Sequence, residues 1–177
     1  DAFDLVEKSD VGCFTDCVTV KVAPHASKFY RFDAEHRLQR TNYEAEGAFL
    51  TDYHELYDPV KAGIAFPLSC AAASGGMVVT NLGGRASNDL VWPEVKIERG
   101  GEQILSFWYQ ASENGAFDVE VDGRCAGTVS VKGTEGRLAA AERRVTLSPG
   151  VHRIRLSNAR ARMPVIDRMT VEGVRDG

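Results

Sequence analysis

Apolar and polar residues alternate in many short runs along this chain, and a period of two residues is typical of half-buried β-strands. In residues 105–109, alternation places Phe107 and the other odd-numbered side chains on one face and Trp108 on the opposite face. We expect the first face to be core. Residues 43–46 have the same pattern near the start of the chain. The pattern therefore predicts an all-β protein of many strands.

The first third of the chain has a different composition from the rest. Alternation predicts strands over residues 15–22 and 27–32, which would form a hairpin. We expect residues 1–33 to be a separate part, 34–41 to be a charged linker, and 42–177 to be one β domain. An isolated hairpin is marginally stable in water, so we expect its apolar face to be covered by the β domain or by a neighbouring chain.

Composition narrows the class of partner. Seventeen glycines among short apolar runs favour strands joined by tight turns. A net charge of −4 and a pI near 5.6 disfavour a nucleic-acid or other phosphate-binding surface. No apolar run approaches the roughly 20 residues that a membrane-spanning helix needs. The chain opens in mid-pattern at Asp1, as a cut piece would, so the lack of a signal peptide says nothing about export.

The four cysteines do not predict a metal site. Cys13 and Cys17 are four residues apart, and Cys70 and Cys125 stand alone, whereas zinc sites use closely paired ligands. We expect mostly buried free thiols. A Cys13–Cys17 disulfide remains open.

The sequence contains no catalytic motif. The four histidines lie outside any Gly-x-Ser-x-Gly or His-Glu-x-x-His pattern, and we expect them to be surface residues. We therefore predict no catalytic residue in this chain. The histidines are His25, His36, His54 and His152.

An ordered set of short motifs resembles the carbohydrate-binding modules of families 35 and 6. The set begins with Tyr-Glu-Ala-Glu and ends with an Ile-Asp-x-Met strand. The resemblance implies a jelly-roll β-sandwich of the galactose-binding-domain type over about residues 42–174, with its first and last strands side by side. The motifs are, in chain order, residues 43–46, 74–79, 88–109 (a central hairpin), 117–123, 151–158 and 166–171.

The same resemblance implies a structural calcium site. Alternation places Glu44 and Glu46 on one face, and Asp167 lies on the last strand, which the family places beside the first. Calcium takes six to eight oxygens, so these carboxylates with backbone carbonyls would suffice. The alternative from the residues alone is that the carboxylates are solvated or paired with Arg168 or Arg155.

Sugar binding needs an aromatic face and planar polar groups. We rank the candidates for a binding surface as Trp108, Trp92 and Asn158, followed by Tyr57 and Asn88. Packing in the core is the alternative for each tryptophan.

Residues 4–12 and 18–28 resemble the end of the antiparallel β domain that follows the catalytic barrel in family 27 α-galactosidases. Val6 stands where that family has Trp, and Ala26 where it has Gly. The resemblance implies that residues 1–33 are the last strands of such a domain. The barrel, which needs about 200 residues or more, is not in this chain.

These observations favour a non-catalytic carbohydrate-binding module that targets an α-galactosidase-like glycoside hydrolase to polysaccharide. Its partners would be an oligo- or polysaccharide and the catalytic domain of the same protein, in a secreted, periplasmic or cell-surface setting. The alternative is a structural β-sandwich that packs on the catalytic domain without binding sugar. An enzyme in its own right is the third class, and no constellation supports it.

Overall fold

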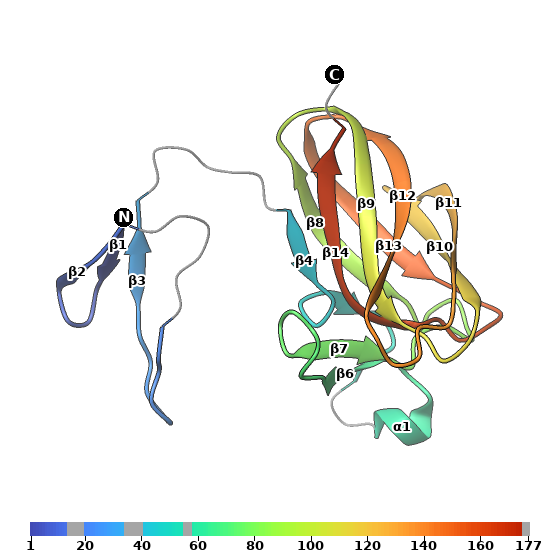
Figure 1. Cartoon of the computed structure of the whole chain (residues 1–177), viewed down its shortest axis with the longest axis horizontal. Coiled ribbons are helices and arrows are strands. Elements are labelled where there is room, and N and C mark those ends of the chain that lie inside the picture. Colours follow the sequence, from blue (N-terminus) through green and yellow to red (C-terminus); the bar gives the residue numbers. More distant parts are fainter. Residues whose placement is uncertain (14–19, 34–40, 55–57, 175–177) are drawn as a thin grey trace. The chain divides into compact units, whose positions relative to one another are not determined.

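The structure is a computed structural model, and it confirms the all-β fold (Figure 1). The chain divides into two compact units, residues 1–38 (unit 1) and 39–177 (unit 2). In the part of the chain that the structure describes, no helix is long and apolar enough to cross a membrane. The structure describes residues 1–13, 20–33, 41–54 and 58–174.

Unit 1 contains a three-stranded antiparallel sheet in the order β2-β1-β3. Its strands are β1 (Ala2–Asp4), β2 (Ser9–Gly12) and β3 (Tyr30–Phe32). The prediction of a strand over 27–32 holds only for its last three residues, which pair with β1. Residues 20–22 are not in a strand, so the predicted hairpin is wrong there, and residues 14–19 lie outside the described part.

The β1–β2 hairpin was missed because its pattern is short and polar. The Asp4 carboxylate accepts hydrogen bonds from the backbone N–H groups of Val6 and Glu7 at 2.9 and 3.0 Å, which holds the turn. Several large apolar side chains of unit 1 are exposed, Phe29 and Phe32 among them. Coverage of this apolar surface by a neighbour therefore stays a prediction.

Unit 2 is a β-sandwich of two antiparallel sheets, and Figure 1 shows their strands in two layers. The first sheet has five strands. In order across it they are β11 (Arg124–Val131), β10 (Gly115–Val121), β13 (Gly150–Ser157), β8 (Leu90–Ile97) and β5 (Phe49–Leu50).

The second sheet has six strands, and it joins the beginning of unit 2 to its end. β4 pairs with β14 outside the main order, with Glu44 opposite Arg168. The expectation that the first and last strands lie together is thus confirmed. The strands are, in order, β12 (Ala139–Leu147), β9 (Gly101–Gln110), β14 (Val165–Gly173), β7 (Met77–Thr80) and β6 (Phe66–Ser69), with β4 (Asn42–Glu44) beside β14.

The central hairpin expected over residues 88–109 does not form. β8 pairs with β5 and β13, whereas β9 pairs with β12 and β14, so the two strands belong to opposite sheets. The turn at Gly100–Gly101 therefore carries the chain across the sandwich. A β-arch of this kind and a hairpin have similar local sequences, because both need a tight glycine turn between strands.

The core lies between the sheets and follows the predicted alternation. Leu105, Phe107 and Tyr109 are buried, and the Phe107 ring meets Phe117 of the opposite sheet edge-on, with 5.4 Å between the ring centroids.

A single helical turn, α1 (Pro59–Ala62), lies in the long connection between β5 and β6. The Asp58 side chain caps its first N–H groups, and Gly63 ends it in the left-handed conformation.

Candidate functional site

Trp92 does not present a ring to solvent. Its side chain is 3% exposed, stacks on Phe107 with 6.4 Å between ring centroids, and donates from Nε1 to the Glu44 carbonyl at 3.0 Å. The ring therefore packs in the core and ties β8 to β4. The structure gives Trp92 the packing role that was the alternative to a sugar platform.

Trp108 lies on the outer face of β9, as the alternation predicts. In the sheet register its neighbours are Ala140 of β12 and Arg168 of β14. The Arg168 guanidinium carbon lies 4.4 Å from the ring centroid, a cation–π contact that covers part of the ring. The indole Nε1 is buried and has no hydrogen-bond partner among the described residues. Trp108 is thus a partly covered platform.

Asn88 and Asn158 both use their amides inside the protein. Asn88 is 1% exposed, and its Oδ1 accepts from the backbone N–H of Ala65 at 2.7 Å. Asn158 donates from Nδ2 to the Ala116 carbonyl at 2.9 Å, and its Oδ1 accepts from two backbone N–H groups of the following loop. Neither amide is arranged to meet a ligand. Tyr57 lies outside the described residues.

Two exposed aromatic residues lie in a segment that contains none of the sugar-binding candidates ranked from the sequence. Phe49 of β5 is 61% exposed, and Tyr53 is 43% exposed. Between them, the Asp52 carboxylate accepts from Arg85 Nε at 2.6 Å and from Ser87 Oγ at 3.0 Å. Aromatic faces beside planar polar groups are the chemistry that recognises sugar rings. Residues 49–53 are hereafter the aromatic segment.

A charged network supports the aromatic segment from beneath. The buried Asp89 carboxylate is bonded to the Thr51 hydroxyl and to the Arg155 guanidinium. Arg155 also donates to the Ala86 carbonyl at 2.7 Å and lies 3.3 Å from a Glu120 carboxylate oxygen. These bonds tie the loop after β5 to the loop before β8, so the polar groups around Asp52 are held in place.

The three carboxylates predicted to hold calcium gather where β4, β14 and the loop before β7 meet. The Ser74 hydroxyl donates to Glu44 Oε1 at 2.6 Å, and the Ser74 backbone N–H donates to Asp167 Oδ1 at 3.1 Å. A Cβ on Gly75 would lie only 2.2 Å from Glu46 Oε1 and 3.5 Å from Glu44 Oε2. Glycine at this position therefore leaves room for the two glutamates.

This carboxylate cluster is electrostatically unbalanced. Burial raises the pKa of Glu46, and the charges of Glu44 and Asp167 raise it further. Burial also raises the pKa of the fully buried Asp167, although the Ser74 N–H and Arg168 oppose this effect. One oxygen each of Glu44 and Glu46 is buried without a hydrogen-bond partner among the described residues.

The carboxylate oxygens of the cluster are the donors that a hard cation such as calcium prefers, although the side chains are not arranged as a complete set of ligands. Within the described ranges, no three His, Cys, Asp or Glu residues are placed so that they could hold a metal ion. Arg168 Nη1 lies 2.6 Å from Asp167 Oδ2 and partly neutralises this carboxylate. The two unpartnered glutamate oxygens are the acceptors that a calcium ion would satisfy.

No catalytic constellation forms among the described residues around the histidines. His25 and His54 are exposed, whereas His152 is buried and bonded to Asp122 and to the Ser148 carbonyl. The expectation of a surface histidine is therefore wrong for His152. His36 lies outside the described residues.

The cysteines also depart from their prediction. Cys13 and Cys125 are exposed and Cys70 is partly buried, all three as free thiols, so the expectation of burial is wrong for them. Cys17 lies outside the described residues.

Comparison of structures shows that unit 2 has the fold of the family 35 carbohydrate-binding modules. A family 35 module from Clostridium thermocellum matches with a TM-score of 0.65 and 21% identity, over 75% of this chain and 98% of that module. A family 35 module from Paenibacillus barcinonensis matches with a TM-score of 0.64 and 20% identity, over 76% of this chain and all of that module.

Larger enzymes match over one of their parts. The β-(1,4)-mannanase of Podospora anserina, which carries a family 35 module, matches with a TM-score of 0.61 and 18% identity, over 80% of this chain and 29% of that enzyme. No protein-family profile and no curated protein sequence matches this chain. The sandwich expected from the sequence is thus confirmed as a fold.

Proposed function

We propose that unit 2 is a non-catalytic carbohydrate-binding module. The observation that carries this proposal is the match of unit 2 to two free-standing family 35 modules over 98% and 100% of their lengths. A similar fold is attached to a mannanase and to an exo-β-1,3-galactanase of Phanerochaete chrysosporium.

The aromatic segment is the surface that best suits a sugar. Phe49 and Tyr53 offer exposed ring faces, and Asp52 with Arg85 offers hydrogen-bonding groups of fixed orientation. Trp108 is the second candidate because Arg168 already covers part of its ring. A shallow surface of this kind contacts few sugar atoms, so we expect weak binding by the isolated chain. Tethering to an enzyme would raise the effective concentration of substrate.

Affinity gels that contain galactans, xylans, pectins or mannans test the proposal. We expect retardation of the full chain by at least one polysaccharide and loss of it in Phe49→Ala/Tyr53→Ala. Val151→Ala is the matched control, because Val151 is also 61% exposed but lies away from the aromatic segment, on β13. Equal retardation of Phe49→Ala/Tyr53→Ala and Val151→Ala would show that the aromatic segment is not the binding surface. Trp108 would then be the remaining candidate, and Trp108→Ala would test it.

One observation favours a structural β-sandwich as the second candidate. Trp92, Asn88 and Asn158 all serve internal contacts, which removes three of the five sugar-binding residues that the sequence ranked. A module that had lost its ligand would keep this core. Absence of retardation on every polysaccharide would establish this alternative.

We also propose that the carboxylate cluster holds a structural calcium ion. Glu44, Glu46 and Asp167 would hold it, and the bound ion would supply positive charge where three carboxylates meet. Mass action then predicts that calcium raises the melting temperature and that a chelator lowers it. An unchanged melting temperature would leave Arg168 as the cluster's counter-ion and contradict the proposal.

We propose that the parent protein is an α-galactosidase-like glycoside hydrolase that works in a secreted, periplasmic or cell-surface setting. The support is the sequence resemblance of residues 4–12 and 18–28, together with the exposed apolar side chains of unit 1. If unit 1 needs a neighbour, its β1 amides should exchange with solvent rapidly in this chain. Slow exchange there would show that unit 1 is stable by itself.

A further inference from the structure

One edge of unit 2 is long and regular, whereas the other edges are short or irregular. β12 pairs with β9 residue for residue over all nine of its residues, and no described strand lies on its other side. β4, β5 and β6 have only three, two and four residues, and β6 contains Pro67. β11 is bulged between Cys125 and Gly127. Short, bulged or proline-containing edges resist the addition of a strand, so β12 is the edge that needs protection.

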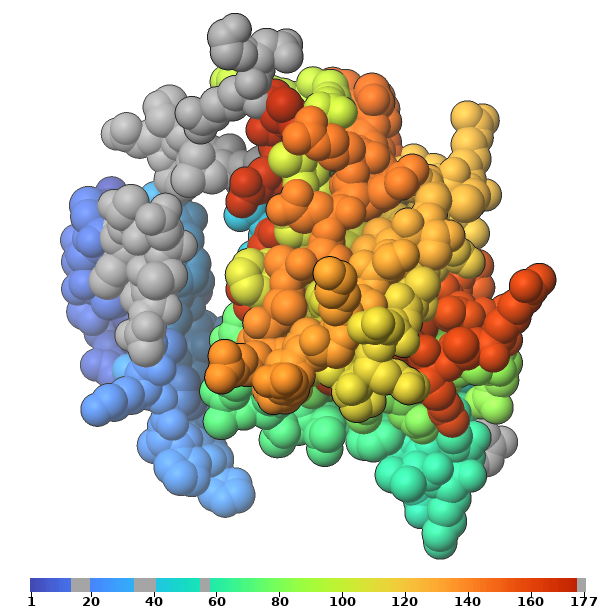
Figure 2. All heavy atoms as spheres, turned by 45° about the vertical axis from the view of Figure 1, so that its right-hand side comes forward, coloured from blue at the N-terminus to red at the C-terminus, as the bar shows by residue number. Residues whose placement is uncertain are grey.

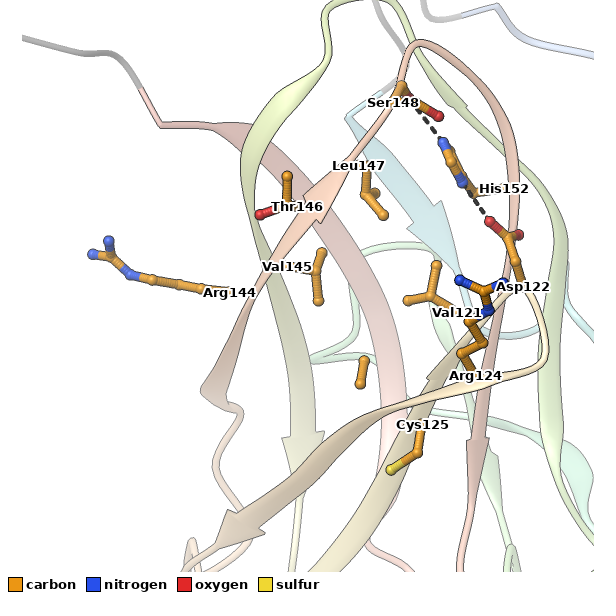
Figure 3. Close-up of a pocket in the computed structure, with 11 residues that line it drawn as sticks. Val121, Asp122, Arg124, Cys125, Arg144, Val145, Thr146, Leu147, Ser148 and His152 are labelled. Atoms are coloured by element: carbon orange, nitrogen blue, oxygen red, sulfur yellow. Dashed lines mark hydrogen bonds and ion pairs between the residues drawn. The ribbon is translucent and has the colours of Figure 1, made fainter.

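β12 lies at the surface of unit 2, and its side chains alternate between two faces. Figure 2 shows the strand in orange, beside the β10–β11 hairpin in yellow. The even-numbered side chains are exposed, whereas the odd-numbered ones are partly or fully buried. In the close-up of Figure 3, Arg144 and Thr146 point to one side of the strand, and Val145 and Leu147 point to the other. Arg143 therefore belongs to the inward-facing series.

Arg143, at the centre of this edge, carries a charge that the fold does not pair. Its Nε is buried without a hydrogen-bond partner, and no described carboxylate forms an ion pair with its guanidinium. The guanidinium lies against Gly127 of β11, where a Cβ would come within 2.5 Å of Nη2. It therefore lies between the edge strands of the two sheets. An unpaired, partly buried charge costs stability, so a reason other than core packing is needed for its position.

The exposed face of β12 is complementary to a second copy of itself. Residues that lie directly opposite each other in an antiparallel pair share one face of the sheet. Two copies of β12 that pair over all nine residues therefore place Ala139 opposite Leu147 and Arg143 opposite itself. In this central register, Glu142 of each copy lies opposite Arg144 of the other copy. Two pairs of opposite charge would thus stabilise the pairing on the exposed face.

The neighbouring registers are less favourable for two identical strands. A shift of two residues, which keeps each side chain on its own face, places Glu142 opposite Glu142 in one direction. The same shift in the other direction places Arg144 opposite Arg144. Like charges directly opposite each other are destabilising. The central register is therefore the one in which this edge best fits a second copy, and Arg143 lies at its centre.

We propose that Arg143 prevents unit 2 from pairing with a second copy of this chain through β12. In the central register, the two Arg143 side chains would lie directly opposite each other on the inward face, with their Cβ atoms about 5 Å apart. Two positive charges at this separation repel each other, and the repulsion is stronger where solvent is partly excluded. An inward-pointing charge is one of the ways in which proteins protect an edge strand. The surface that Arg143 blocks is the free edge of β12, and the partner that it excludes is an identical chain.

The test removes the charge and measures association through β12 in the full chain. Arg143→Val places a β-branched residue between Ala141 and Val145 on the inward face. We expect the variant to form a dimer in analytical ultracentrifugation, and its amides at residues 139–147 to exchange with deuterium more slowly as the protein concentration rises. Wild-type exchange at these residues should not depend on concentration. Because this measurement reports on β12 alone, association through the exposed apolar side chains of unit 1 cannot imitate the result.

Three further variants separate the charge at this position from other effects. Arg143→Lys retains the positive charge, so its β12 should remain unpaired. Arg153→Val is the matched control, because Arg153 is exposed on β13, which lies between β10 and β8 and is not an edge strand. Glu142→Arg, combined with Arg143→Val, replaces two attractive pairs in the central register with two repulsive ones. It should weaken the dimer about tenfold.

A melting curve checks that each variant is folded, and Arg143→Thr provides the same test if Arg143→Val does not fold. Exchange of the β12 amides that is independent of concentration in the folded, uncharged variant would overturn the proposal. Concentration-dependent protection of β12 in wild type, in Arg143→Lys or in Arg153→Val would also overturn it. A dimer of Arg143→Val that Glu142→Arg does not weaken would overturn it too, because the two copies would not be paired in the central register. The proposal does not depend on sugar binding.

Discussion

Replacement of Asn88 tests whether its side-chain amide stabilises the fold or binds sugar. Its Oδ1 accepts from the Ala65 N–H at 2.7 Å, and its Nδ2 donates to the carbonyls of Asn81 and Gly83 at 2.7 and 2.8 Å. Asn88→Ala would leave these three groups without that partner in a site that is 1% exposed. Each unsatisfied buried group costs about 1–3 kcal/mol, and partial relaxation lowers the sum. We expect a loss of about 3–5 kcal/mol in the free energy of unfolding.

Urea denaturation of the full chain, followed by circular dichroism, measures this loss. Asn114→Ala is the matched control, because Asn114 makes a single exposed hydrogen bond, to the Gly133 N–H at 3.1 Å. We expect that control to lose at most about 1 kcal/mol. A stability loss below 1 kcal/mol for Asn88→Ala, together with lost polysaccharide retention, would refute the structural assignment and restore Asn88 as a ligand contact.

Three further predictions concern the buried polar groups. Because the pKa of Glu46 is raised, its contribution to stability is present at low pH and is lost as the pH rises through that pKa. Glu46→Gln should therefore stabilise the calcium-free chain at pH 7 and reduce the rise in melting temperature that calcium causes, and an undiminished rise would contradict this. The pKa of His152 is also raised, so its contribution to stability is present below about pH 6.5 and is lost as the pH rises through the folded pKa. In urea titrations, the stability advantage of wild type over His152→Asn should therefore shrink as the pH rises, and a pH-independent difference would contradict this prediction. Trp92→Phe removes the bond to the Glu44 carbonyl and some core volume, so it should cost about 1–3 kcal/mol in urea denaturation with polysaccharide retention unchanged, and lost retention at full stability would contradict it.

The alternating pattern predicted strands well but not how they pair. It placed Phe107 and Trp108 on opposite faces of β9 correctly, because period two holds through a regular strand. In β8 the pairing with β13 shifts, so that Trp92 faces Ile154 and Val95 faces His152. Two residues of β8 then lie opposite one of β13, a bulge that turns both Trp92 and Val95 inward. Strict alternation cannot anticipate such a bulge.

The sites were harder to predict than the fold, for physical reasons. The sequence does not distinguish a loop asparagine whose amide binds a ligand from one whose amide, like that of Asn88, bonds to backbone groups of the same protein. Phe49 follows small residues in a two-residue strand, which is too short for a periodic signal. The carboxylate cluster was predictable only in part. The resemblance placed the strand of Asp167 beside that of Glu44, which the pairing of β4 with β14 confirms, but β4 ends at Glu44 and Glu46 lies in the turn that follows, where alternation does not apply. The cluster's partners Ser74 and Gly75 come from a distant loop that only the folded chain reveals.

Chemical-shift mapping of a bound oligosaccharide tests the central claim most directly. The ligand is the shortest oligosaccharide of whichever polysaccharide the affinity gels retain, titrated into the ¹⁵N-labelled full chain. If unit 2 binds sugar through the aromatic segment, amides of residues 49–53 and 85–89 should shift together and saturate with one affinity. No saturable shift with any oligosaccharide, or shifts confined to the face around Trp108 and Arg168, would contradict the claim.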